Sequence, residues 1–180
     1  PYFKGDIYTD MEELGKKISI EFNNFKKEYN KDLELIFEPG KYLVSEAGYF
    51  LTKVNYVKEG TKNKFAQINS GFNHFIRPAL YNSYHEIENI SNPSNKREKY
   101  SVVGYICEND TFAKDRNISK IKKGDILCFN NAGAYGFSMS SNYNSRFTPP
   151  EVCYYNNDFK LIRKSQEIKD ILKNQIIIDL

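Results

Sequence analysis

Six short segments after Gly48 constrain the fold of this chain more than any other feature of its sequence. β-Branched and aromatic residues are frequent in them, and turns or polar loops separate them, which is typical of β-strands. Asn156 and Asn157 suit a tight hairpin turn, and a short closing helix is expected over residues 165–174. Residues 49–180 are therefore predicted to form an all-β domain, either a sandwich or a barrel. The predicted strands are residues 49–57, 64–69, 100–106, 124–130, 151–155 and 158–164.

The sequence before Gly48 has a helical pattern instead. Apolar side chains recur every three or four residues from Met11 to Tyr29, which predicts an amphipathic helix packed on a core. Asp10 and Glu13 resemble a capping box at its start. Residues 33–37 then form a short apolar run that leads into a turn, so a strand is expected there. A helix followed by a strand is the unit of an α/β layer or barrel, and we place the domain boundary near Gly48.

Composition and charge exclude several classes of function. The net charge of +3 comes from charged residues scattered along the chain, which argues against a nucleic-acid partner. No apolar run approaches the roughly 20 residues that span a bilayer, and no signal peptide is recognisable at the start. Three cysteines without a CxxC pair, with two histidines, predict neither a disulfide framework nor a metal site. A cytoplasmic location is the default expectation.

Two reactive groups stand just past predicted strands. Cys107 and Glu108 follow residues 100–106, and Tyr135 lies between glycines after residues 124–130. Loops at the ends of rigid strands commonly present functional side chains. Taken alone, a cysteine is more often a small core residue, and this is what we expect of Cys128 and Cys153 within strand patterns.

Four motifs, in this order, resemble the C-terminal half of the diaminopimelate decarboxylase family, a branch of the fold-type III, alanine-racemase-like pyridoxal phosphate decarboxylases. They are EPGK at 38–41, SGFNHFIRPALYNSYHEI at 70–87, VVGYICENDTFAKD at 102–115 and GAYGFSMSSNYNSR at 133–146. The resemblance implies an α+β chain in which residues 1–48 end a (β/α)8 barrel and residues 49–180 form the β domain. It also implies a homodimer with shared active sites. The Schiff-base lysine and the glycine-rich phosphate loop of the family precede the matched region, so we expect a partial copy that is inactive alone.

The resemblance assigns three residues to the cofactor, pyridoxal 5'-phosphate. Glu38 resembles the carboxylate that keeps the pyridine nitrogen protonated, so that the ring accepts the electrons released when carbon dioxide departs. Gly40 allows close approach of the phosphate. Tyr135 resembles the tyrosine that touches both the phosphate and the substrate. Without the neighbouring motifs, Glu38 and Gly40 would be read as turn residues and Tyr135 as a packing residue.

Five further residues are assigned to substrate and proton transfer. Arg77 resembles a carboxylate clamp and Tyr81 a substrate-side hydroxyl, while Lys41 stands where the family more often has a second arginine. Lysine keeps the charge but loses the bidentate fork. Cys107 resembles the proton donor, and Glu108 could bind the distal ammonium of a substrate with an amino acid at both ends. Segment 138–146 serves either an interface or a loop.

The predicted reaction is the conversion of meso-2,6-diaminopimelate to L-lysine and carbon dioxide. The Cys-Glu pair favours this substrate, because the relatives that act on basic amino acids have aspartate after the cysteine. Two alternatives remain. One is a decarboxylase of the same fold for ornithine, arginine or carboxynorspermidine. The other is a non-catalytic homologue that acts as a binding protein.

Overall fold

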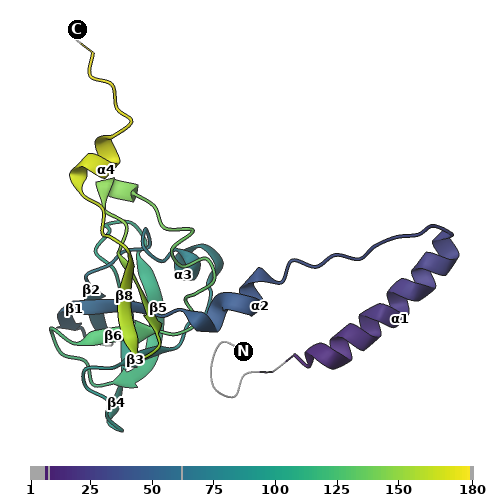
Figure 1. The fold of residues 1–180 in the computed structure, drawn as a ribbon. Coiled ribbons are helices and arrows are strands. Elements are labelled where there is room, and N and C mark those ends of the chain that lie inside the picture. The colour runs from purple at the N-terminus through teal and green to yellow at the C-terminus, as the bar shows by residue number, and fades with distance from the viewer. Residues whose placement is uncertain (1–6, 8, 62, 179–180) are drawn as a thin grey trace.

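A curved sheet of six strands forms the centre of the molecule (Figure 1). The computed structural model describes residues 7, 9–61 and 63–178, so the outermost residues of both predicted domains lie outside it. The strand order is β3-β6-β1-β2-β4-β5, in which only β2 and β4 pair in parallel. The strands are β1 (Phe50–Glu59), β2 (Lys64–Ile68), β3 (Ile87–Asn89), β4 (Arg97–Val103), β5 (Thr111–Ser119) and β6 (Ile126–Phe129).

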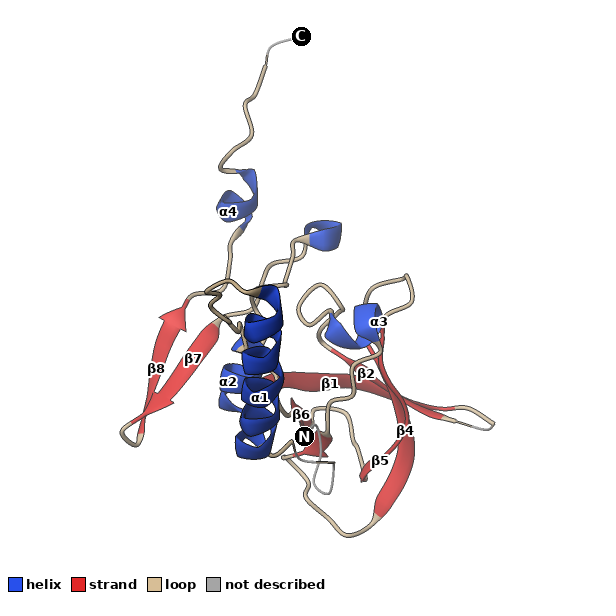
Figure 2. Ribbon diagram, turned by 90° about the vertical axis from the view of Figure 1, so that its right-hand side faces the viewer, coloured by secondary structure: helices blue, strands red, loops and turns tan. Residues whose placement is uncertain are grey.

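The two edge strands of this sheet, β3 and β5, contact one another. Figure 2 shows the strong curvature of β4, the strand that pairs with β5. The sheet is therefore a nearly closed barrel, one of the two architectures predicted. Closure of this kind protects the unpaired backbone groups that an open sheet leaves at its edges.

The interior of the barrel is apolar and largely aromatic. Phe50 lies against Phe75 with ring centroids 5.3 Å apart, and Phe112 meets the edge of Phe129 at 5.5 Å. Such pairs add to the free energy gained by burying apolar area. Phe75 belongs to the 70–87 motif, so the motif that carries Arg77 is anchored in the core. The fully buried aliphatic side chains include those of Val54, Ile68, Val102, Ile118 and Leu127.

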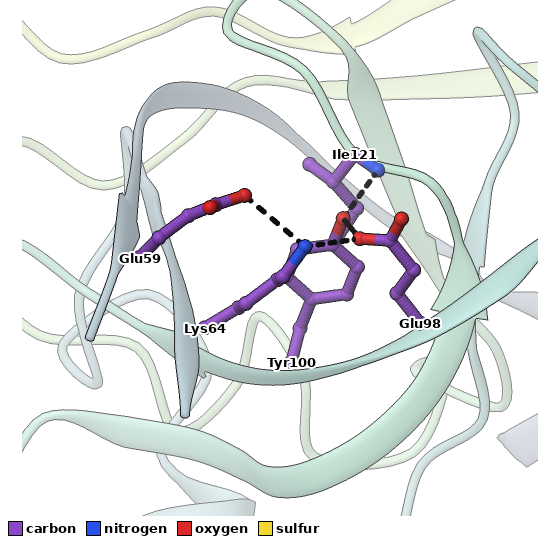
Figure 3. A network of polar contacts seen from close by, with 5 residues as sticks. All are labelled: Glu59, Lys64, Glu98, Tyr100 and Ile121. Carbon is purple, nitrogen blue, oxygen red and sulfur yellow. Dashed lines mark hydrogen bonds and ion pairs between the residues drawn. The ribbon is translucent and has the colours of Figure 1, made fainter. Parts of the chain in front are cut away.

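A polar network joins β1, β2 and β4 around the buried side chain of Tyr100 (Figure 3). Lys64 Nζ lies 3.1 Å from Glu59 and 2.7 Å from Glu98. The Tyr100 hydroxyl donates to Glu98 at 3.0 Å and accepts the backbone N–H of Ile121 at 3.1 Å. The hydrogen bond to Lys64 is the main reason that the pKa of Glu98 is lowered. The network ties β4 to the consecutive strands β1 and β2, since 34 positions separate Lys64 from Glu98.

The C-terminal part forms a separate two-stranded sheet of β7 (Glu151–Tyr155) and β8 (Asp158–Arg163). Asn156 and Asn157 between them have φ values of 50° and 60°, so the predicted tight turn is confirmed. The closing helix, α4 (Ile168–Leu172), is shorter than predicted. Glu167 is its N-cap and forms a capping box with Asp170.

The N-terminal helix α1 (Met11–Tyr29) was predicted correctly in position but not in environment. Asp10 caps it by accepting the N–H groups of Glu12 and Glu13. It has no buried residue, and Figure 1 shows it joined to the sheet by an extended segment. Its apolar stripe faces a shallow groove completed by Leu35 and Phe37 rather than a core.

The prediction of a strand at residues 33–37 is wrong for the described part of the chain. The segment is extended, but a strand needs a neighbour to accept its hydrogen bonds, and no described segment pairs with it. Two short helices, α2 (Gly40–Val44) and η1 (Ser45–Ala47), then lead into β1. The assignment of residues 1–48 to a (β/α)8 barrel, with a boundary near Gly48, stays a prediction. None of the helices in the described part of the chain has the length and apolarity needed to cross a membrane.

Candidate functional site

Close backbone packing places α2 beside the loop that follows β6. The Ala132 N–H donates to the Gly48 carbonyl at 2.8 Å, and the Gly133 N–H donates to the Ser45 carbonyl at 3.0 Å. A Cβ on Gly48 would lie 2.5 Å from the Gly133 Cα, so this approach requires glycine. The contact brings α2 to Tyr135: a Cβ on Gly40 would lie 4.0 Å from the Tyr135 hydroxyl.

Arg77 begins the short helix α3 (Arg77–Tyr81) and meets Tyr135 from the other side. The Arg77 Cζ lies 5.6 Å from the centre of the Tyr135 ring and 5.7 Å from that of Tyr81. Nη2 donates to Ser83 Oγ at 3.3 Å. The guanidinium is buried, whereas Tyr135 is 46% exposed and adopts a left-handed backbone with φ of 60°. The arrangement holds a cation and exposes a phenol next to it.

The charges around Arg77 and Tyr135, the first group of predicted site residues, favour an anionic ligand. Burial lowers the pKa of Lys41, and the nearby Arg77 lowers it further. His85, which sequence reasoning did not single out, is buried beside them, and its Nδ1 lies 2.9 Å from the Asn130 carbonyl oxygen. Burial lowers the pKa of His85, and the charges of Arg77, Lys41 and Arg116 add to this effect. A neutral imidazole therefore lies among cations whose mutual repulsion a phosphate or carboxylate would relieve.

The loop between β4 and β5 carries the second group, Cys107 and Glu108. The buried carboxylate of Asp110 fixes this loop by accepting the N–H groups of Ile106 at 2.9 Å and Phe72 at 2.8 Å. Burial raises the pKa of Asp110, while the two backbone hydrogen bonds oppose the rise. Sequence reasoning missed this residue, because an aspartate near a turn carries no sign of the distant N–H group it accepts.

Cys107 and Glu108 both point into solvent-accessible space and contact each other. The Cys107 thiol lies 3.5 Å from Glu108 Oε2, and the Tyr143 hydroxyl donates to Glu108 Oε1 at 2.6 Å. The hydrogen bond from Tyr143 is the main reason that the pKa of Glu108 is lowered. The pair thus presents an ionised carboxylate, suited to an ammonium group, next to a thiol that can donate a proton.

The predicted site residues therefore fall into two groups. Gly40, Lys41, Arg77, Tyr81 and Tyr135 lie around the start of α3, and Cys107 with Glu108 lies on the β4–β5 loop. Among the described residues, no recorded contact joins the two groups. Glu38 is exposed just before α2, where its carbonyl oxygen accepts the Gly40 N–H at 2.8 Å, and its side chain belongs to neither group. Cys128 is buried as predicted, while Cys153 is only partly so.

Comparison with known proteins agrees with the resemblance found from the motifs. The family model for "Pyridoxal-dependent decarboxylase, C-terminal sheet domain" matches residues 41–133. A diaminopimelate decarboxylase of Methanothermobacter thermautotrophicus is 41% identical over 178 residues, which cover 97% of this chain and 41% of that protein. The chain spans about two fifths of the length of curated relatives from three archaea.

Among solved structures, the chain resembles diaminopimelate decarboxylases in both sequence and fold, and a more distant decarboxylase in fold alone. The crystal structure of diaminopimelate decarboxylase from Methanocaldococcus jannaschii in complex with L-lysine has a TM-score of 0.87 at 36% identity, covering 99% of this chain and 41% of that one. A lysine/ornithine decarboxylase from Vibrio vulnificus has a TM-score of 0.52 at 15% identity, covering 58% and 29%, and shows the fold alone. The family model covers more than half of the chain. The chain therefore belongs to the pyridoxal-dependent decarboxylases and carries the C-terminal sheet domain of that family.

Proposed function

We propose that this chain takes part in the pyridoxal phosphate-dependent decarboxylation of meso-2,6-diaminopimelate to L-lysine and carbon dioxide, together with the (β/α)8 barrel that the resemblance implies. The observation that carries the proposal is the ionised carboxylate of Glu108 beside the Cys107 thiol. Diaminopimelate has an ammonium at each end, and a second carboxylate distinguishes this substrate from simple diamino acids. A site for it needs both an anion and cations, and the chain supplies both.

The first group fits the cofactor that the family implies. The phenol of Tyr135 lies beside the open backbone of Gly40, which suits a phosphate, and the two cations next to them make the surroundings favourable for an anion. Gly40 and Tyr135 would hold the phosphate, and Glu38 the ring nitrogen. When bound, pyridoxal phosphate supplies a protonated ring that accepts the electron pair released when carbon dioxide departs.

The cations of the first group would bind and orient substrate carboxylate. Arg77 is held by Ser83 and two aromatic rings, which preserves the fork geometry that a carboxylate matches bidentately. Lys41 adds charge without that fork. Tyr81, which is 57% exposed, has its ring beside the guanidinium and would offer its hydroxyl to the substrate.

The second group would bind the distal ammonium and move a proton. Glu108 takes the ammonium, and Cys107 delivers the proton from Sγ to the former α-carbon. Because the two groups have no contact within the described chain, we infer that a two-fold dimer joins them, with Cys107 and Glu108 of one subunit serving the first group of its partner. A cytoplasmic enzyme fits this biosynthetic role.

The second candidate is a decarboxylase of ornithine, arginine or carboxynorspermidine. Glutamate rather than aspartate after the cysteine disfavours it, as does the low identity to the lysine/ornithine enzyme.

The test is an assay of the full-length protein, supplied with pyridoxal phosphate and meso-diaminopimelate, in which carbon dioxide and L-lysine are measured. We expect equimolar release of both, and no release from the 180-residue chain alone. A full-length protein that binds the cofactor but releases neither product would favour the non-catalytic homologue.

A further inference from the structure

Tyr143 makes the shortest recorded contact to the Glu108 side chain, although 35 positions separate the two residues. Its hydroxyl donates to Oε1 at 2.6 Å, which leaves Oε2 beside the Cys107 thiol at 3.5 Å. A carboxylate with one oxygen held by a strong donor loses the rotation about its terminal bond. The orientation of Glu108 is therefore set from outside its own loop.

The same segment that fixes the β4–β5 loop also fixes Tyr143. The Phe72 ring packs on the Tyr143 ring with centroids 5.2 Å apart, while the Phe72 N–H is held by Asp110. Ser141 exchanges hydrogen bonds with Asn73: its N–H donates to the Asn73 carbonyl at 2.8 Å, and its carbonyl accepts the Asn73 side chain at 3.3 Å. Residues 70–75 thus act as a common frame for both loops.

The backbone after Tyr143 turns sharply. Asn144 and Ser145 both have left-handed φ values, 55° and 54°. The Asn142 side chain closes this turn by donating to the Arg146 carbonyl at 2.8 Å and to Gln166 at 2.6 Å. A serine at positive φ is strained, so the turn is held by its surroundings. Segment 138–146, whose role the sequence left open, is built to carry Tyr143.

We propose that Tyr143 is a positioning residue for Glu108, which orients the carboxylate toward the distal ammonium of the substrate and keeps its second oxygen beside the Cys107 thiol. The proposal rests on the function proposed above. Tyr143 acts through Glu108 and needs no contact with the substrate. Loss of its hydroxyl should weaken substrate binding more than it slows the chemical step, because Glu108 binds a part of the substrate that does not react.

The test uses the full-length holoenzyme with the variants Tyr143→Phe, Glu108→Gln and the double variant. Tyr154→Phe, on β7, is the matched control, because Tyr154 is exposed and its hydroxyl donates to Asn157 within its own hairpin. We expect Tyr143→Phe to raise the KM for meso-diaminopimelate roughly tenfold, the scale of one hydrogen bond to a charged group, with a smaller change in kcat. In the Glu108→Gln background it should have no further effect.

A second readout does not depend on turnover. Carbon-13 NMR titration of the Glu108 carboxyl should show its pKa rising in Tyr143→Phe, since Cys107, Asp110 and Tyr143 are the titratable groups that face it. Wild-type KM and titration in Tyr143→Phe would overturn the proposal, and so would an equal loss of activity in the Glu108→Gln background. A wild-type enzyme inactive on diaminopimelate contradicts the proposed function, and the titration still decides whether Tyr143 controls Glu108.

Discussion

Asp110 Oδ2 lies 2.9 Å from the backbone nitrogen of Ile106, and this buried hydrogen bond sets the course of the loop that presents Cys107 and Glu108. Gly104 lies against the same carboxylate. A Cβ there would overlap Asp110 and lie 2.6 Å from the Ser70 carbonyl oxygen. The candidate proton donor thus depends on a glycine and an aspartate that are not expected to touch substrate.

Substituting Gly104→Ala should therefore displace Asp110 and loosen the loop. We expect the free energy of unfolding to fall by about 1–3 kcal/mol, the usual cost of overpacking, and the KM of the full-length enzyme to rise. Gly15→Ala is the control, because the added carbon would meet no atom within 4 Å beyond the local backbone of its own helix, and alanine favours the helix. Urea denaturation measures the effect, and equal stability of the two variants would contradict it.

The cysteines should differ in reactivity. Cys107 is exposed, whereas burial raises the pKa of Cys128 to about 11. At pH 8 the thiolate of Cys128 is then about a thousandth of the total, and its sulfur is shielded as well. Iodoacetamide followed by mass mapping should label Cys107 first and Cys128 last. Labelling of both at the same rate in the folded protein would argue against this environment.

Stability should fall in mild acid because the buried His85 and the half-buried His74 must take up protons. The pKa values of His85 and His74 are lowered in the folded chain, mainly by burial. At a pH between the ordinary histidine pKa of 6.5 and the lower pKa in the folded chain, the unfolded chain binds more protons than the folded one. The free energy of unfolding is therefore highest above pH 6.5 and declines below it. We expect the free energy of unfolding to drop from pH 7.5 to 5.5.

His85→Gln is the variant that tests this dependence, since glutamine is polar but does not titrate. In this variant the free energy of unfolding should decline less steeply with falling pH, and the remaining slope is the contribution of His74. Arg77, Lys41 and Arg116 are the charged groups that disfavour protonation of His85. An unchanged slope in the variant would assign the decline to other groups.

Substitutions of Lys41 test whether a positive charge without the bidentate fork of arginine suffices to bind the substrate carboxylate. Lys41→Met should raise the KM for meso-diaminopimelate about tenfold, as expected for loss of one charged contact. Lys41→Arg should keep or improve binding, because it restores the bidentate fork. Steady-state kinetics on the two variants decide the point, and a Met variant with wild-type KM would remove Lys41 from the substrate site.

The strands that sequence reasoning located are those with apolar or aromatic patterns, such as β1 and β6. It missed β5, where Lys114, Asp115, Arg116 and Asn117 form a polar run and Asp115 takes a left-handed φ of 50° at a break in register. It also missed β3, which has only three residues. Periodicity correctly located α1, but periodicity does not identify the surface that a stripe covers.

In the candidate site, too, sequence patterns revealed some residues and not others. Motifs marked Cys107, Glu108, Arg77 and Tyr135, whose side chains carry recognisable chemistry. Asp110, Tyr143 and His85 lie within the same motifs but received no role, because their roles lie in contacts with partners 35 to 45 positions away. Such contacts exist only once the barrel has closed.

The most direct test of the central claim is the kcat/KM of the full-length enzyme for carbon dioxide release from meso-diaminopimelate, ornithine and arginine. We expect carbon dioxide release from diaminopimelate alone, and we expect Glu108→Gln to raise the KM for diaminopimelate. Release from ornithine or arginine in preference to diaminopimelate would keep the fold and the cofactor but contradict the roles assigned to Glu108 and Arg77.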